Sequence, residues 1–80
     1  MSEVARRLRI KYSLTSDPDR HEIRLYRLRV REYIALGYIN EEAGEKSAQE
    51  NFSDYHTSFY RSQADTVEML LLLISEELKE

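Results

Sequence analysis

A chain of 80 residues with no cysteine and a net charge of −3 is long enough for one small domain and excludes disulfides and thiol chemistry. A domain of this size buries only about 60% of its unfolded surface, so its core is marginal and self-association is a usual remedy. The longest apolar run, residues 69–74, is too short to span a bilayer, and the first residues lack the apolar segment of a signal peptide. We therefore expect a single domain over residues 1–80 of a soluble, cytoplasmic protein with no membrane segment.

Charge is distributed unevenly along the chain. Residues 1–40 carry nine Lys or Arg against five Asp or Glu, whereas residues 41–80 carry three against ten. Such an asymmetry favours an electrostatic partner for each half. The halves either attract one another, within a chain or head to tail between copies, or the basic half meets a polyanion.

The first structured segment is predicted as a β-strand over about residues 8–14. Apolar and polar residues alternate here, with Leu8, Ile10, Tyr12 and Leu14 apolar and Arg7, Arg9, Lys11 and Ser13 polar. A period of two is typical of a half-buried strand, in this case with one basic face. A lone strand needs another to pair with, either from a second copy or from elsewhere in the chain. The alternative is a helix over residues 4–14.

A long helix is predicted over about residues 18–37. Asp17 is suited to cap its first turn, Pro18 fits the first helical position, and Gly37 marks its end. Apolar residues fall on two sides of this helix: Ile23, Tyr26, Val30, Tyr33, Ile34 and Tyr38 on one, and Leu25, Leu28, Ala35, Leu36 and Ile39 on the other. Between the two sides lies a strip of arginines, Arg24, Arg27 and Arg31. We expect one side to pack in the core and the other to meet a further element or a partner.

The second half of the chain is predicted as an acidic loop followed by helix. Residues 40–51 are polar and contain no apolar residue larger than Ala, which is typical of a solvated loop. Residues 52–80 contain neither Gly nor Pro and predict one helix or two. Asp65 and Glu68 have the spacing of a capping box. An apolar stripe suited to self-association follows, made of Val67, Leu70, Leu71, Ile74 and Leu78.

The sequence offers little for catalysis or metal binding. Its histidines are His21, in the first turn of the long helix, and His56. Residues 53–58 hold the side-chain types of a hydrolase triad, but at this spacing they do not converge. Zinc needs three or four convergent ligands, and a phosphate loop needs clustered glycines. We therefore predict no catalytic residue, cofactor or metal site, and a protein that is not an enzyme.

Basic side chains are the candidate contacts for a polyanion or an acidic partner. They are Arg7, Arg9 and Lys11 of the predicted strand and Arg24, Arg27 and Arg31 of the long helix. A basic strand followed by a helix is similar in outline to the ribbon-helix-helix DNA-binding proteins, which implies nucleic-acid binding through arginine. An acidic segment follows the helix, however, and the pI is about 5.4. The alternative is that these arginines pair with acids of the C-terminal half.

Residues 25–33 (LYRLRVREY) and 37–39 (GYI) resemble the first helix of GNAT-like N-acyltransferases, in the branch of N-acyl amino acid synthases and autoinducer synthases. Residues 54–59 (DYHTSF) are similar to a later acidic segment of that family. The resemblance covers residues 5–60 and implies a fold that opens with a strand. The family's Gly-rich turn, which holds the pyrophosphate of the acyl donor, has no counterpart here, so no catalytic or cofactor residue is carried over. What the resemblance implies is a remnant or fragment without the active site.

Together these features predict a mainly α domain that opens with a strand and is completed by self-association. The expected function is that of a non-catalytic interaction or regulatory protein that contacts another protein and forms a homo-oligomer. The contact between copies would use the stripe over residues 67–78 or the second side of the long helix. Nucleic-acid binding through the basic strand and the arginine strip is one alternative, and an acyltransferase remnant is the other.

Overall fold

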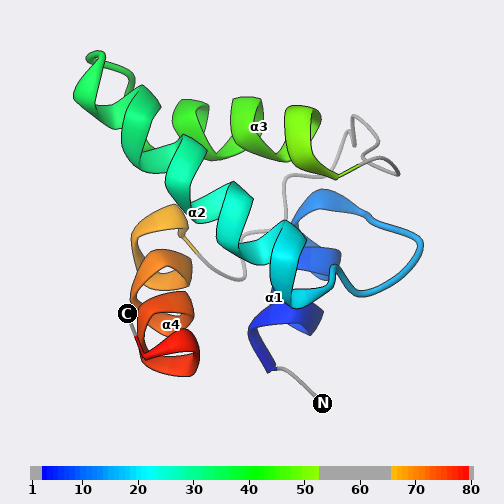
Figure 1. Cartoon of the computed structure of the whole chain (residues 1–80). Coiled ribbons are helices and arrows are strands. Elements are labelled where there is room, and N and C mark those ends of the chain that lie inside the picture. The colour runs from blue at the N-terminus through cyan, green and yellow to red at the C-terminus, as the bar shows by residue number, and fades with distance from the viewer. Residues whose placement is uncertain (1–2, 53–65, 80) are drawn as a thin grey trace.

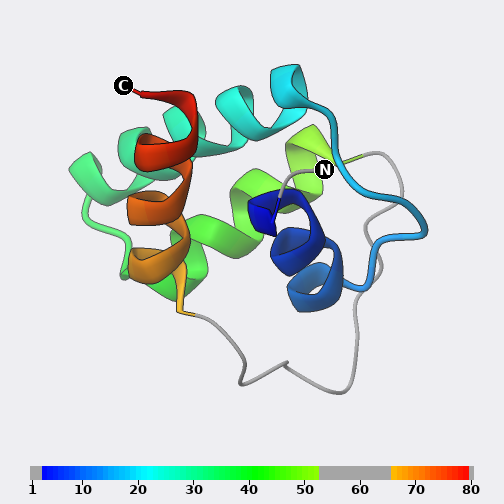
Figure 2. The ribbon, with the colours of Figure 1, turned by 90° about the horizontal axis from the view of Figure 1, so that it is seen from below.

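The computed structural model describes residues 3–52 and 66–79, and this part of the chain forms helices and no strand. The helices are α1 (Glu3–Tyr12), α2 (Arg20–Ala35), α3 (Asn40–Asn51) and α4 (Val67–Leu78). α2 and α3 form a hairpin that is the most extensive helix–helix contact, and α1 and α4 pack together against it (Figures 1 and 2). The prediction of a mainly α domain is confirmed in these ranges.

The prediction of a β-strand over residues 8–14 is wrong, because these residues form the end of α1 and the turn after it. The helix buries a set of residues with helical spacing: Val4, Ala5, Leu8 and Tyr12. Ile10, which the strand pattern would turn inward, is 49% exposed. Leu8 and Tyr12 satisfy both periods, so alternation alone is ambiguous here. A helix satisfies its own backbone hydrogen bonds, whereas a lone strand leaves them unpaired.

A left-handed turn ends α1 and returns the chain to the core. Ser13 has a φ of 55°, and the N–H of Leu14 donates to the carbonyl oxygen of Arg9 at 3.0 Å. This hydrogen bond is the one that defines a Schellman motif, in which the residue after the left-handed position packs back on the helix. Leu14 is accordingly buried.

α2 is the predicted long helix, shortened at both ends. It begins with a capping box, in which Asp19 Oδ1 accepts the N–H of Glu22 at 2.8 Å and Glu22 Oε1 accepts the N–H of Asp19 at 3.1 Å. Asp17, the predicted cap, instead forms an ion pair with Arg9 at 2.7 Å. This pair attaches the connection between α1 and α2 to the end of α1.

The C-terminal end of α2 is a second Schellman motif, as Gly37 predicts. Gly37 has a φ of 105°, which glycine adopts without strain, and the N–H of Tyr38 donates to the carbonyl oxygen of Tyr33 at 3.1 Å. The rings of Tyr33 and Tyr38 are 5.2 Å apart between centroids and supply the apolar contact of the motif.

Only one of the two apolar sides of α2 is buried. Ile23, Tyr26 and Val30 lie in the core. On the opposite side, Leu25 is 37% and Leu28 is 47% exposed, and Leu36 beyond the end of the helix is 74% exposed. The second side therefore remains at the surface.

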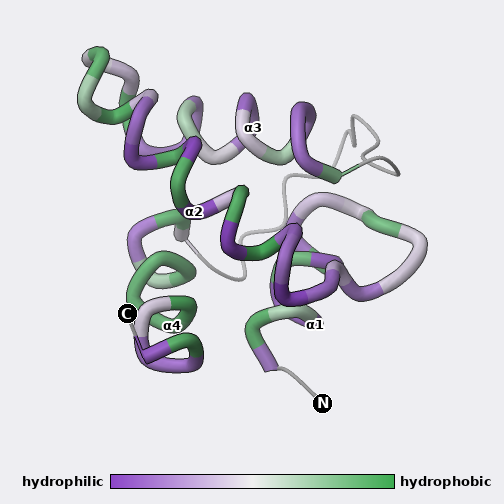
Figure 3. Tube along the Cα trace, in the orientation of Figure 1, coloured by the Kyte–Doolittle hydropathy of each residue, from purple (hydrophilic) through white to green (hydrophobic). Residues whose placement is uncertain are grey.

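The prediction of an acidic loop over residues 40–51 is wrong, because these residues form α3. The buried side of α3 consists of small residues, namely Ala43, Gly44, Ser47 and Ala48. Small side chains let α2 and α3 approach closely, and Ser47 Oγ donates to the carbonyl oxygen of Tyr26 at 2.8 Å across that contact. The helix lacks large apolar residues, and Figure 3 shows how little hydrophobic colour it carries. Its sequence therefore has the composition of a loop.

Three aromatic rings form the centre of the core. Tyr12, Tyr26 and Phe52 come from α1, α2 and the C-cap of α3, and each pair has ring centroids 5.4–6.2 Å apart. The hydroxyl oxygens of Tyr12 and Tyr26 are hydrogen-bonded at 2.7 Å inside this cluster. Gly44 packs directly against both hydroxyl groups, because a Cβ there would lie 2.7 Å from one and 3.1 Å from the other.

Thr66 caps the N-terminus of α4, and its side chain accepts the N–H of Met69 at 3.2 Å. The predicted cap, Asp65, lies outside the described residues. Residues 53–65, which belong to the one or two helices predicted over residues 52–80, lie outside them as well. Glu41 fixes the start of α4, because its Oε2 accepts the N–H of Val67 at 2.8 Å while its Oε1 accepts from Lys11 Nζ at 2.8 Å. A single carboxylate thus connects α1, α3 and α4.

A surface cluster joins the two helices of the hairpin. Arg29 Nε lies 2.8 Å from Glu50 Oε1, and the hydroxyl group of Tyr33 donates to the other oxygen of Glu50. These hydrogen bonds, first that from Tyr33 and then that from Arg29, hold the pKa of Glu50 below its usual value. The Arg29–Glu50 and Lys11–Glu41 ion pairs each join a basic residue of residues 1–40 to an acidic residue of residues 41–80.

No helix in the described residues is both long enough and apolar enough to cross a membrane.

Candidate functional site

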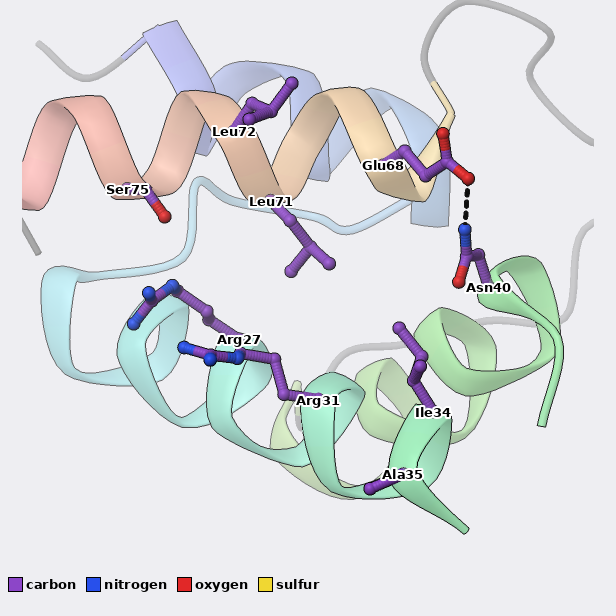
Figure 4. A pocket seen from close by; sticks show the side chains of 9 residues that line it. All are labelled: Arg27, Arg31, Ile34, Ala35, Asn40, Glu68, Leu71, Leu72 and Ser75. Atoms are coloured by element: carbon purple, nitrogen blue, oxygen red, sulfur yellow. Dashed lines mark hydrogen bonds between the residues drawn. The ribbon is translucent and has the colours of Figure 1, made fainter. Parts of the chain in front are cut away.

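A groove of about 700 Å³ runs between α2 and α4 and is drawn in Figure 4. Its lining residues come from α2, from the start of α3 and from α4, and they are Arg27, Arg31, Ile34, Ala35, Asn40, Glu68, Leu71, Leu72 and Ser75. The two long walls run in opposite directions, so Arg27 lies near Ser75 while Asn40 lies near Glu68 (Figure 4). The groove therefore has two chemically distinct ends.

The first end is basic. Arg27 and Arg31 stand one helical turn apart on α2, and their guanidinium groups extend side by side toward the Ser75 end (Figure 4). Arg27 is half-buried and has an interaction of its own. Arg31 is exposed and has no ion pair with the described residues. A guanidinium group in this position is available to a carboxylate or phosphate from another molecule.

The middle of the groove is apolar. Leu71 projects from α4 toward α2, where Ile34 and Ala35 form the opposite wall (Figure 4). Leu71 and Ile34 are half-buried, so their exposed surface is the floor of the groove. Leu72 stands at the rim and is 67% exposed. Covering this surface would remove apolar area from water, which is the main driving term of protein association.

The second end is closed by a hydrogen bond between α3 and α4. Asn40 Nδ2 donates to Glu68 Oε1 (Figure 4). Glu68 lies in the first turn of α4, where a carboxylate interacts favourably with the helix dipole. This end of the groove therefore carries a fixed negative charge.

The six predicted basic contact residues fall into two groups that the fold does not merge. On α1, Arg7 pairs with Glu3 at 2.8 Å, Arg9 with Asp17, and Lys11 with Glu41. On α2, Arg27 and Arg31 line the groove, and Arg24 lies one turn before Arg27 at the surface. The α1 group is occupied by carboxylates of the same chain, so Arg31 of the groove is the stronger candidate for an external contact.

The predicted self-association stripe is mostly used inside the chain. Val67, Leu70, Ile74 and Leu78 are buried against the other helices, so they are not a free surface for a second copy. Leu71 alone of the five is half-buried, and it lines the groove. Of the predicted stripe, therefore, Leu71 is the residue that remains partly open to another molecule.

Candidates for catalysis and metal binding gain no structural support. His21 is exposed at the start of α2, and residues 53–58 with His56 lie outside the described residues. Within residues 3–52 and 66–79, no three His, Asp or Glu side chains are grouped so that they could hold a metal ion.

Several residues of the groove are absent from the sequence-based candidates. Asn40 was assigned to a loop, and Ser75 and Leu72 have no distinguishing motif. Leu72 did carry a signal, because it lies off the predicted apolar stripe of α4, one helical turn after Met69, which is also apolar. Met69 is 50% and Leu72 is 67% exposed, and exposed apolar residues that lie together, unlike single ones, mark a surface contact.

No protein-family model, curated protein or solved structure matches this chain. The resemblance to GNAT-like N-acyltransferases has no support from these comparisons. It implies an opening strand, and the described residues open with α1 instead. The ribbon of paired strands that a ribbon-helix-helix protein needs is likewise not formed by residues 3–52 and 66–79.

Proposed function

We propose that this chain is a non-catalytic protein–protein interaction protein of a regulatory kind, and that it associates with itself through the groove between α2 and α4. The observation that carries the proposal is that Leu72, at the rim of the groove, is 67% exposed while the middle of the groove is apolar. A small domain that leaves such a surface uncovered gains stability by association. A cytoplasmic location is part of the proposal, since the chain lacks the cysteines of small secreted domains.

The groove favours another polypeptide over a small substrate. Its charged groups stand at opposite ends rather than converging on one point (Figure 4). Catalysis needs groups that converge on a reacting atom. A protein surface needs an apolar centre with a polar rim, which is the arrangement of Leu71 and Leu72 between Arg31 and Glu68.

Sedimentation velocity across a concentration series tests self-association. The expected result is a mass that rises from the 9.5 kDa of one chain toward a multiple of it. Leu72→Asn should shift this transition to higher concentration by about tenfold, because it removes apolar area from the contact. Leu36→Asn is the matched control, since Leu36 is 74% exposed but does not line the groove.

The proposal fails if the chain remains monomeric up to about 1 mM, a concentration at which even a contact of about −4 kcal/mol is half formed. It also fails if Leu36→Asn weakens association and Leu72→Asn does not, because the contact would then lie on the second side of α2.

A further inference from the structure

The groove carries opposite charges at its two ends and apolar side chains between them. Arg27 and Arg31 mark one end, Glu68 marks the other, and Leu71 lies in the middle (Figure 4). A rotation of 180° about an axis through the middle exchanges the two ends. The rotated surface therefore presents its acidic end to the basic end of the original, and its apolar centre to the apolar centre. This pattern is complementary to itself.

We propose that the groove is the interface of a two-fold symmetric homodimer in which Arg31 of each copy pairs with Glu68 of the other. The inference rests on the proposed self-association and adds its geometry. In a two-fold interface the same patch serves both subunits, and each contact occurs twice. The α4 helices of the two copies run antiparallel across the axis, with Leu71 of each near the centre and Leu72 at the rim.

The local chemistry of Glu68 suits this contact. Asn40 Nδ2 donates a hydrogen bond to Glu68 Oε1, which fixes the orientation of the carboxylate. Oε2 has no hydrogen bond with the described residues and is left to accept from a guanidinium group. Arg31 is the matching donor, because it is exposed and has no ion pair within the same ranges. Arg27, one turn away, adds positive charge to the same end.

A second copy fits this surface better than other polypeptides for reasons of charge. A purely acidic partner would satisfy Arg31 but place its carboxylates against Glu68 at the other end, where like charges repel. A basic partner would meet the reverse conflict at Arg27 and Arg31. Only a surface with both charges at the same separation and in the reverse order satisfies both ends, and the chain itself carries such a surface.

Charge exchange between two variants tests the pairing. Arg31→Glu and Glu68→Arg should each weaken the homodimer at least about 100-fold, because each creates two like-charge contacts per dimer. An equimolar mixture of the two variants should form a heterodimer of wild-type strength, since each of its contacts again joins opposite charges. The double variant R31E/E68R should form a homodimer alone.

The matched control is Arg6→Glu, which makes the same charge change on α1 at a side chain that is 61% exposed and outside the groove. It should leave the dimer intact. Far-ultraviolet circular dichroism and thermal unfolding show whether each variant folds. If a charge-reversed variant does not fold, Arg31→Ala and Glu68→Gln replace it, and each should weaken the dimer about tenfold.

The outcomes separate this inference from the proposed function. A monomeric wild-type chain overturns both. If the wild type does form an oligomer, two results overturn the inference alone. Either the mixture of charge-reversed variants forms no dimer, or Arg31→Glu leaves the strength of the wild-type dimer unchanged. A mass that grows beyond twice that of one chain also overturns the inference, because a closed two-fold interface stops at two copies.

Discussion

Gly44 of α3 and Val67 of α4 are in contact so close that a methyl group on Gly44 would lie 2.5 Å from Val67 Cγ2. The same methyl group would lie 2.7 Å from the hydroxyl oxygen of Tyr12. Alanine is favoured over glycine in a helix by about 1 kcal/mol, so Gly44→Ala would stabilise an isolated α3. In the folded chain we expect the steric cost of the added methyl group to exceed this gain in helix propensity. Gly44→Ala should therefore lower the free energy of unfolding by roughly 1–3 kcal/mol.

Urea unfolding measures this change, with Gln49→Ala as the control because Gln49 is an exposed residue of the same helix. The control should be within about 0.5 kcal/mol of the wild type. A Gly44→Ala chain more stable than the wild type would contradict the packing of α3 against α4.

The buried hydroxyl pair of Tyr12 and Tyr26 should behave as a coupled unit. Tyr12→Phe removes the hydrogen-bond partner of Tyr26, whose side chain has no exposed surface, and should cost about 1–3 kcal/mol. Replacing both tyrosines should cost less than the sum of the single changes, because no hydroxyl group then remains unpaired. A double-mutant cycle by chemical denaturation gives the coupling energy. Additive costs would show that the two hydroxyl groups act independently.

The left-handed turn after α1 should be improved by glycine. Ser13 is exposed and has a φ of 55°, a conformation that costs energy for any residue with a Cβ. Ser13→Gly should raise the free energy of unfolding by about 0.5–1 kcal/mol. Ser13→Ala keeps the Cβ and should give no such gain, so the difference between the two variants in thermal unfolding isolates the backbone effect.

Glu50 should contribute to the acid sensitivity of the fold. Its pKa is lower in the folded chain than the usual 4.5, first because Tyr33 and then because Arg29 hydrogen-bond to the carboxylate. A depressed folded pKa gives stability that is present above the unfolded value and is lost as the pH falls through the folded value. The difference in Tm between wild type and Glu50→Gln should therefore be larger at pH 7 than below about pH 4. A Tm difference that does not change with pH would contradict the ionised cluster. The expected change in the Tm difference is modest, because solvent screens the Arg29–Glu50 pair.

The sequence predicted α2 and α4, whose large buried residues fit a helical period and not a period of two. Ile23, Tyr26 and Val30 identified the inner side of α2, and the apolar stripe of α4 identified a helix. Gly37 identified the end of α2 because glycine readily adopts the left-handed conformation that often follows a helix. These signals are local, and they depend on residues that pack in the core in the way their size suggests.

The remaining elements depended on information that a single segment does not contain. α3 packs through Gly44 and Ser47, so its buried side is recognisable only once Tyr26 and Val67 are in place. α1 was ambiguous because Leu8 and Tyr12 fit two periods, and Ser13 gave no sign of a turn. The groove was not predicted, because its walls come from three helices that only the fold brings together.

Burial of the Tyr26 phenol has a spectroscopic consequence. Burial raises its pKa well above the usual 10.0, against a smaller opposing effect of the hydrogen bond with Tyr12. The folded state therefore keeps this proton while the unfolded state releases it, so stability is fully present below pH 10 and declines as the pH rises further. The chain has six tyrosines and no tryptophan, so its ultraviolet absorbance reports phenolate formation directly. Alkaline titration should show a late, cooperative rise in absorbance that coincides with the loss of helix, giving a label-free measure of folding.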